Sequence, residues 1–554
     1  MVAARARRHA LLAGWAGVCL LALAGLPGCR RDEPARPPAA APAASEQDPV
    51  PGDTIVAGSI GDASNLLPAL ASDASSFDII GLVYNGLVRY DKDLKIEGEL
   101  ASSWEVSPDG LQIVFHLRPG VKWHDGADFT AADVEYTWRV MTDPKTPTAY
   151  GEDFRQVKRL EVLDPLTVRV TYDKPFAPAL ISWGFAVMPK HLLEGKDIAA
   201  SPLARSPVGT GPYRFREWKT GEKIVLEAND GYWEGRPNID RYLYRIIPDS
   251  ATMFLELSAG NVDEMALDPV QYTRQTDTEF FARNYRKYRY LADSYSYLGF
   301  NLRLPLFQDK RVRQAISHAV NKQEIIDIVL LGLGQEATGP YKPGTWAHNP
   351  NVRRYPYDPV RAQALLAEAG WDAKGSDGVL MKGGKRFAFT LMTNQGNKTR
   401  AKAAEVIQKN LKAAGIDVSI RVVEWAAFLK EFVNPKKFDA VILGWTIPRD
   451  PDAYDVWHSS KTGPAELNHV SFRNDEADAL IEKGRRTFDQ EERRAAYGRF
   501  QEILAEEQPY VFLYVPDALP IVAARFKGIV PAPAGISYNF IKWWVPKSEQ
   551  KHTR

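Results

Sequence analysis

Residues 100–138 read LASSWEVSPDGLQIVFHLRPGVKWHDGADFTAADVEYTW, and this stretch specifies a local fold by itself. The SPDG sequence at 107–110 is typical of a turn, because Pro presets φ, Asp bonds to its own backbone and Gly accepts a positive φ. Residues 111–118 then alternate between apolar and polar side chains, a period of two that gives a β-strand one apolar face. Thr130 and Asp133 have the spacing of a capping box at the start of a helix. The stretch therefore predicts a β-hairpin followed by a helix.

The same stretch closely resembles the signature of the family 5 extracellular solute-binding proteins, which deliver peptides and other small solutes to ABC transporters. Further similar stretches are FNLRLPLFQDKRVRQAISHAVNKQEII at 300–326, YDPVRAQALLAEAGW at 357–371 and LGWTIPRDPDAYDVWHSS at 443–460. Within 100–138 the residues that match the family pattern are Ala101, Ser103, Trp104, Ser107, Asp109, Gly110, Phe115, Leu117, Arg118, residues 120–126, Ala131, Asp133 and Val134. A match of this length is a specific signal, and the resemblance extends over residues 54–545.

The resemblance implies a fold class and a domain plan. The expected fold is α/β, the two-lobed periplasmic-binding-protein fold of class II (cluster C), with an additional subdomain in lobe one. The segments expected for lobe one are 53–86, 206–295 and 515–554, with the subdomain at 87–205 and lobe two at 296–514. At 554 residues the chain is also too long for a single hydrophobic core, so a division into domains agrees with its size.

Residues 1–29 are expected to be an export signal. Arg5, Arg7 and Arg8 precede an apolar run at 10–26, which is short for a membrane-spanning helix. Residues 26–29, LPGC, resemble a bacterial lipobox, so the resemblance makes Cys29 the expected lipidated residue; an uncleaved membrane anchor is the alternative. Residues 30–52 are rich in Pro and Ala without hydrophobic periodicity, which predicts a disordered tether. The protein is expected in the cell envelope, periplasmic and lipid-anchored to a membrane.

Composition and motifs exclude several classes of function. A formal net charge of +1 gives no reason to expect a nucleic-acid partner. Of the two cysteines, Cys19 lies in the signal, so a chain that begins at Cys29 cannot form a disulfide within itself. The motifs HExxH, CxxC and GxSxG and a P-loop are absent, and the KTG at 461–463 is interpreted as coincidence. The histidines lack metal-ligand spacing, and residues 372–378 are interpreted as a polar hairpin turn rather than a calcium loop. We therefore expect no enzyme activity, no cofactor and no metal, and a monomer.

Two tryptophans are the first candidates for ligand contact. Trp425 follows a predicted strand that ends at 424, and Trp445 follows one that ends at 444. Open α/β sheets bind ligands at the carboxyl ends of their strands, and family members have pocket tryptophans at the matching positions. The alternative for each is a place in the core. The candidates that come from the resemblance alone are Ser64, Asn65, Tyr297, Asn301, Asn394 and Gln395.

The predicted function is a receptor that captures extended peptides between two closing lobes and delivers them to the permease subunits of an ABC transporter. Strand edges can pair with the N–H and C=O groups of any peptide, and bridging waters let roomy pockets accept varied side chains. Two alternatives stay open. The same fold could bind a non-peptide solute, such as a nickel chelate, haem, an opine or a sugar, or the chain could be an exported enzyme.

One position departs from the family pattern. Peptide receptors of this fold commonly carry an Asp three residues after the tryptophan that matches Trp445, where it pairs with the α-amino group of the ligand. Here that position is Pro448, which has neither a charge nor an N–H donor. We therefore expect a weak requirement for a free N-terminus, unless the loop brings Asp450 into that place.

Overall fold

The computed structural model describes residues 48–464 and 466–552. The predicted signal, Cys29 and residues 30–47 of the predicted tether lie outside this part of the chain. No helix among the described residues is both long and apolar enough to cross a membrane.

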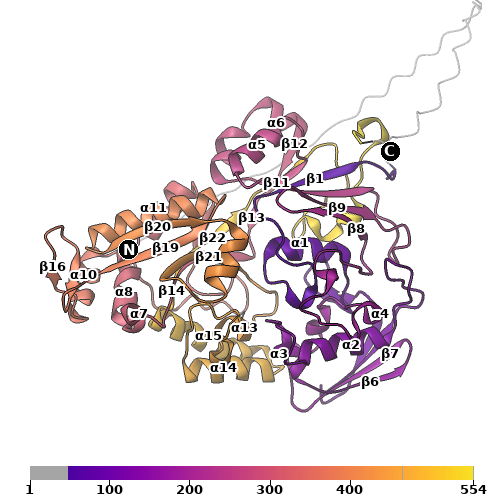
Figure 1. Cartoon of the computed structure of the whole chain (residues 1–554), viewed down its shortest axis with the longest axis horizontal. Coiled ribbons are helices and arrows are strands. Elements are labelled where there is room, and N and C mark those ends of the chain that lie inside the picture. Colours follow the sequence, from indigo (N-terminus) through magenta and orange to yellow (C-terminus); the bar gives the residue numbers. More distant parts are fainter. Residues whose placement is uncertain (1–47, 465, 553–554) are drawn as a thin grey trace, which may run out of the picture. The chain divides into compact units, whose positions relative to one another are not determined.

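The first sheet, on the right in Figure 1, has seven strands in the order β12-β23-β11-β1-β10-β9-β8. Its strands are β1 (Thr54–Ser59), β8 (Tyr213–Lys219), β9 (Lys223–Ala228), β10 (Arg241–Ile246), β11 (Glu264–Ala266), β12 (Tyr285–Lys287) and β23 (Pro520–Ala523). β1 runs parallel to both β10 and β11, so the amino-terminal strand lies between strands from the middle of the chain. This sheet therefore unites three segments that are distant in sequence.

A buried ion cluster joins these three segments. The Arg525 guanidinium, 7% exposed, pairs with Asp53 next to β1 and with Asp263 next to β11, the latter at 2.8 Å. It also donates to the carbonyl oxygen of Thr54 at 3.1 Å. Both carboxylates are almost fully buried, so the cation that neutralises them is part of the core of this sheet.

The second sheet has seven strands: six follow the order β13-β22-β14-β21-β19-β20, and β15 pairs with β22 beside them. Its strands are β13 (Tyr290–Leu291), β14 (Ser294–Phe300), β15 (Gly334–Glu336), β19 (Ala388–Asn394), β20 (Asp417–Val423), β21 (Ala440–Thr446) and β22 (Tyr510–Ala518). Alternate residues of β14, β21 and β22 enter two different hydrophobic clusters, one on each face of the sheet. The helices α8 (Lys310–Ala319), α10 (Pro359–Glu368) and α11 (Lys398–Ala413) supply one cluster, and α14 (Asp475–Arg486) and α15 (Gln490–Glu507) supply the other.

The opening stretch of the sequence folds as predicted. β4 (Ala101–Val106) and β5 (Gln112–Leu117) form the hairpin, and α2 (Ala131–Thr142) follows it. The Asp133 carboxylate accepts a hydrogen bond from the Thr130 backbone N–H at 2.9 Å, and the Thr130 hydroxyl caps the first turn of α2. With β6 (Val157–Asp164) and β7 (Thr167–Tyr172) the hairpin forms a four-stranded sheet in the order β4-β5-β7-β6.

The remaining elements are short. Residues 372–378 lie in the predicted polar hairpin, where β16 pairs with β17 in antiparallel register. Asn321 caps the single turn α9, after which the chain continues as a π-helical turn over Ile325–Val329. These elements are α1 (Ala74–Val83), α3 (Gly151–Arg155), α4 (Lys190–Leu193), α5 (Ser250–Ser258), α6 (Glu279–Asn284), α7 (Pro305–Gln308), α9 (Lys322–Glu324), α12 (Trp425–Ala427), α13 (Tyr454–Trp457), β2 (Val88–Tyr90), β3 (Ile96–Gly98), β16 (Ala373–Lys374), β17 (Leu380–Lys382) and β18 (Lys385–Arg386).

Two short crossings connect the first sheet to the second. The chain passes from β12 to β13 through residues 288–289, and it returns from β22 to β23 through Leu519. The backbone N–H of Tyr288 donates to the carbonyl of Pro520 at 2.9 Å, and that of Ala292 donates to the carbonyl of Pro516 at 3.0 Å. The two crossings therefore lie side by side as hydrogen-bonded, antiparallel neighbours. The predicted lobe boundaries stay a prediction.

Candidate ligand-binding site

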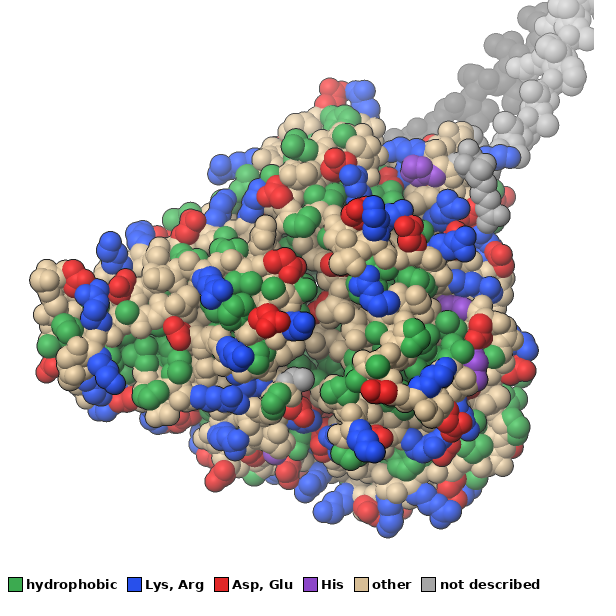
Figure 2. Space-filling model, viewed as in Figure 1, with side chains coloured by type: hydrophobic (Ala, Val, Ile, Leu, Met, Phe, Trp, Pro, Cys, Tyr) green, Lys and Arg blue, Asp and Glu red, His purple; other side chains and the backbone are tan. Residues whose placement is uncertain are grey.

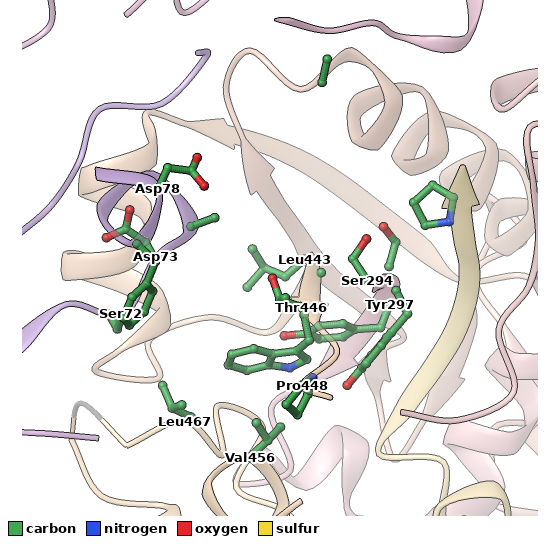
Figure 3. A pocket seen from close by; sticks show the side chains of 18 of the residues that line it. Ser72, Asp73, Asp78, Ser294, Tyr297, Leu443, Thr446, Pro448, Val456 and Leu467 are labelled. Atoms are coloured by element: carbon green, nitrogen blue, oxygen red, sulfur yellow. The ribbon is translucent and has the colours of Figure 1, made fainter. Parts of the chain in front are cut away.

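A cavity of about 960 Å³ is lined by residues of both sheets and of the helix α1. Its walls include Ala74, Phe77 and Asp78 of α1, residues 294–297 of β14 and residues 443–446 at the carboxyl end of β21 (Figure 3). This volume is at the upper end of the range for small-molecule pockets, about 300–1,000 Å³. In Figure 2, positive and negative side chains are mixed over the visible face.

Both predicted tryptophans line this cavity. Trp425 begins α12 directly after β20, and its indole N–H has no partner among residues 48–464 and 466–552. Trp445 lies inside β21 rather than after it, because this strand continues to Thr446. The Trp445 indole stacks on the His469 ring, with centroids 5.1 Å apart, and its N–H donates to the Tyr510 hydroxyl at 3.2 Å. Both indoles are half-buried, so they have surface left for a ligand.

Tyr297 and Asn394 lie one layer behind the surface of the cavity. Tyr297 borders the cavity but is fully buried, and its ring stacks on Tyr510 with centroids 3.8 Å apart. Asn394 is the last residue of β19, and its amide oxygen accepts a hydrogen bond from the Arg400 guanidinium at 2.9 Å. Arg400 itself lines the cavity, so Asn394 positions a cavity residue.

Besides Asn394, four candidates that rested on the resemblance do not line the cavity, and for three of them local hydrogen bonding explains why. Ser64 donates to the Asp73 carboxylate, and the Asn65 amide oxygen accepts from the Leu67 N–H at 2.9 Å within a turn. The Asn301 amide is buried and donates to the carbonyl oxygens of residues 436 and 438. Gln395 is exposed outside the lining.

His469 is a wall residue that sequence reasoning missed. It is 5% exposed, and neither ring nitrogen has a hydrogen-bond partner among the residues described. Burial, with the nearby Lys436 ammonium as a second cause, lowers the pKa of His469 to about 3, so the ring is neutral at pH 7. A lone histidine in the sequence gives no signal for such a position, because the stack on Trp445 forms only in the folded chain.

The loop after Trp445 has its charges paired. Pro448 lines the cavity and is labelled in Figure 3. The Arg449 guanidinium pairs with Asp293 at 2.7 Å. Both carboxylate oxygens of Asp450 accept hydrogen bonds from Arg493, at 2.7 and 3.0 Å. Asp450 therefore reaches the cavity with its charge already neutralised by an arginine.

A second arginine connects α14 to the subdomain side of the cavity. Arg485, 5% exposed, pairs with Asp153 of α3 and with Asp452 at 2.9 Å. Its carbonyl accepts a hydrogen bond from the Ala177 N–H at 2.6 Å, and its guanidinium lies 5.0 Å from the centre of the Phe176 ring. Burial raises the pKa of Asp153 and of Asp452, and the Arg485 charge opposes both shifts. We call this group the Arg485 contact.

Metal ligation finds no support in the described part of the chain, where no group of three or more His, Cys, Asp and Glu side chains could hold a metal ion. The cavity instead offers two indoles, an imidazole and paired charges, which suit an organic ligand.

Comparison with known proteins identifies the family. The sequence model described as "Bacterial extracellular solute-binding proteins, family 5 Middle" matches residues 95–466. The chain belongs to this family. The matched residues include the opening stretch, the strands β14, β19, β20 and β21, and the two cavity tryptophans.

Similar proteins and structures agree with this assignment. The oligopeptide-binding protein AppA of Bacillus subtilis is 36% identical over 509 residues, which cover 90% of this chain and 93% of AppA. Its structure in complex with a nonapeptide has a TM-score of 0.86 at 35% identity, covering 90% of this chain and 100% of that one. NikZ of Campylobacter jejuni in complex with Ni(L-His) has a TM-score of 0.81 at 29% identity, covering 89% and 100%. DppA of Helicobacter pylori in complex with the peptide STSA has a TM-score of 0.81 at 30% identity, covering 90% and 98%. The expected fold class is confirmed.

Replacing Trp445 with alanine is expected to weaken ligand binding at least tenfold while costing less stability than a core substitution. A fully buried Trp→Ala change costs about 3–5 kcal/mol of unfolding free energy, but Trp445 is half-buried and its cavity-facing surface contributes to binding. Titration calorimetry and thermal melting of Trp445→Ala, with Trp425→Ala as a second variant, separate the two effects. Normal affinity together with a large loss of melting temperature would assign these residues to the core alone.

Proposed function

We propose that this protein is a solute-binding receptor of the cell envelope that captures peptides in the 960 Å³ cavity and delivers them to the permease subunits of an ABC transporter. The observation that supports this most is the cavity itself, enclosed by both sheets and walled by Trp425 and Trp445. Similar proteins support the same ligand class, because AppA and DppA were each solved with a peptide bound. The receptor binds and releases its ligand and catalyses no reaction.

The proposed mechanism is closure of two lobes around the peptide. The two sheets are the cores of these lobes, connected through the two crossings. In the closed form the peptide backbone pairs with polar groups of the cavity edges, and the indoles pack against its side chains. The Arg485 contact then holds α14 against α3 on the far side of the cavity.

A non-peptide solute is the second candidate, since NikZ was solved with Ni(L-His). The described residues lack a metal-ligand group, so such a solute would have to bring its own ligands.

Mass spectrometry of small molecules that copurify with the protein tests the proposal directly. We expect peptides of mixed sequence, which should then bind to ligand-free protein by titration. Copurified chelates, haem or sugars without peptides would replace the peptide proposal by the second candidate.

Acetylation of the peptide N-terminus is expected to change affinity by less than tenfold, about 1.4 kcal/mol. Pro448 offers no charge, and Asp450 is already paired with Arg493 at 2.7 Å, so no free carboxylate in this loop attracts an ammonium group. Titration of one good peptide in free and acetylated forms measures the difference. A hundredfold loss on acetylation, reproduced by Asp450→Asn with the free peptide, would show that Asp450 binds the amine.

Replacing Cys29 with serine is expected to release the protein from membranes completely. The proposed lipid on Cys29 is the membrane anchor, because residues 30–52 have no apolar segment that could replace it. Fractionation of cells that express the two forms measures the difference. Unchanged recovery of Cys29→Ser in the membrane fraction would favour the uncleaved anchor instead.

A further inference from the structure

A second cavity of about 550 Å³ adjoins the main cavity, and we call it the annex. Asp78, Asp268 and Thr399 are among the residues that line both cavities, so a ligand in the main cavity can extend a side chain into the annex. Tyr242, Tyr244 and Phe540 form aromatic walls of the annex. Its lining thus combines aromatic surface with charged groups.

Two carboxylates of the annex have no cationic partner. Asp78 of α1 and Glu264 of β11 line the annex, and neither forms an ion pair or a side-chain hydrogen bond within residues 48–464 and 466–552. In Figure 3 the Asp78 carboxylate points toward the interior of the cavity. The other carboxylates nearby have partners, because Asp73 caps α1 and Asp268 accepts from the Gln271 N–H at 2.8 Å. Asp78 and Glu264 therefore face the annex, which is open to solvent, without a cationic partner.

The positive groups around the annex do not offset this charge. Lys398 lines the annex, but its ammonium pairs with Asp249 at 3.3 Å. Burial raises the pKa of Asp78 to about 6, with Asp73 as a second cause. It also raises the pKa of Glu264 to about 7, with Asp78 and Asp263 as further causes. The Asp78 charge thus disfavours the ionised form of Glu264, and a cation that neutralises Asp78 would relieve this cost.

A hydroxyl group of the annex also lacks a partner. Ser250, at the start of α5, is 9% exposed and lines the annex, and its hydroxyl oxygen has no hydrogen-bond partner among the residues described. A buried hydroxyl without a partner costs free energy that a ligand donor can recover. This observation is independent of the two carboxylates and indicates a ligand group that forms hydrogen bonds, because a hydroxyl can accept from an N–H as well as donate.

We propose that the annex is a side-chain subsite for a cationic residue of the ligand, an ammonium or guanidinium group on an aliphatic stem. The inference rests on the proposed peptide-binding function and deepens it by naming a preferred class of peptide. The stem packs against Tyr242 and Phe540, and the cation donates to Asp78, Glu264 and Ser250. A bare metal ion fits less well, because no group of three or more ligating side chains exists in the described part of the chain.

The test uses N-acetylated pentaalanine peptides that carry one lysine at each position in turn. Each is compared with the peptide that carries norleucine, a neutral side chain of similar length, at the same position. Titration to the ligand-free full-length protein is expected to show at least a tenfold preference for lysine at one position. In Asp78→Asn/Glu264→Gln this preference should fall below threefold.

The matched control is Glu256→Gln, which removes a carboxylate of α5 that pairs with Arg245 at 2.7 Å and lies outside the linings of both cavities. It should keep the full lysine preference. The single variants Asp78→Asn and Glu264→Gln replace the double variant if the latter fails to fold by circular dichroism.

The remaining outcomes overturn the inference in distinguishable ways. Equal affinity for lysine and norleucine peptides at every position would reject the annex subsite while the peptide receptor stands. Absence of binding by every peptide would reject the proposed function and the subsite with it.

Repeating the series with free N-termini tests whether the α-amino group of the peptide, rather than a lysine side chain, occupies the annex. A tenfold gain from the α-amine, lost in Asp78→Asn/Glu264→Gln, would assign the annex to the peptide N-terminus instead.

Discussion

Replacement of Arg485 by methionine is expected to weaken ligand binding at least a hundredfold. The change leaves the partly buried carboxylates of Asp153 and Asp452, 29% and 17% exposed, without their cation, and removing one partner of a buried ion pair costs about 3–5 kcal/mol. In the proposed open form these carboxylates regain water, so the cost falls on closure and therefore on affinity rather than on folding. Titration calorimetry measures the loss of affinity, and thermal melting without ligand shows whether the fold is intact.

Arg486→Met is the matched control for this experiment. Arg486 is the next residue of α14, but it is half exposed and pairs with Glu482 four residues earlier at 3.3 Å. Exposed pairs of this kind contribute about 0–1 kcal/mol, so affinity should change by less than about fivefold. Normal affinity of Arg485→Met would show that the Arg485 contact does not contribute to closure.

Measuring the affinity of Arg485→Met at two pH values tests the same prediction in a second way. Burial raises the pKa of Asp153 and Asp452, and it raises that of the neighbouring Asp455 to about 6, where Lys461 opposes the shift. A raised pKa means that the buried state favours the protonated form, so protonation favours closure once the arginine is gone. Lowering the pH from about 7.5 to about 5.5 should therefore restore part of the affinity of Arg485→Met relative to wild type.

Replacement of Arg525 by methionine is expected to lower the unfolding free energy of the first sheet by about 3–5 kcal/mol. Arg525 is the cation between Asp53 and Asp263, which are 1% and 2% exposed. Without it two buried carboxylates face each other where β1, β11 and the segment after β23 meet. Urea unfolding followed by far-ultraviolet circular dichroism measures the shift of the midpoint.

Lys527→Met provides the comparison for Arg525. Lys527 lies two residues further along, is 39% exposed and pairs with Glu549 at 3.5 Å. Its replacement should change the unfolding free energy by less than about 1 kcal/mol. Equal urea midpoints for Arg525→Met and wild type would mean that the ion cluster contributes nothing to the stability of this sheet.

Local structure was predictable where neighbouring residues specify it. Three patterns act within a few residues and therefore predict the hairpin and α2 directly: the turn at 107–110, the alternation before Arg118 and the capping box of Thr130. Pro359 begins α10 for the same reason, since proline is favoured at the first position of a helix. Strand ends were less accurate: β21 extends two residues beyond the end predicted at 444, because its pairing with β14 continues to Thr446.

The candidate site was predictable only in part. Trp425 and Trp445 could be chosen because a strand end is a local feature with a known place in α/β sheets. Ser64, Asn65 and Asn301 carried no such signal, and in the structure their side chains complete hydrogen bonds in turns and loops. Asp78 and Glu264 could not be predicted, because they line one cavity only in the folded chain. Arg485 and Asp153 are 332 residues apart, and no local pattern relates them.

The two crossings restrict how this molecule can move. Between β12 and β13 there are two residues, Tyr288 and Arg289, and between β22 and β23 there is one, Leu519. Hydrogen bonds hold the two connections beside each other, and Pro516 and Pro520 flank Leu519 with fixed φ angles. The backbone torsions of a few residues must then absorb any displacement of one sheet against the other, which leaves a single hinge axis and no freedom to slide. One pair of fluorescent labels placed across the cavity would consequently follow the whole opening angle, so this chain is suited to conversion into an optical sensor for its own ligand.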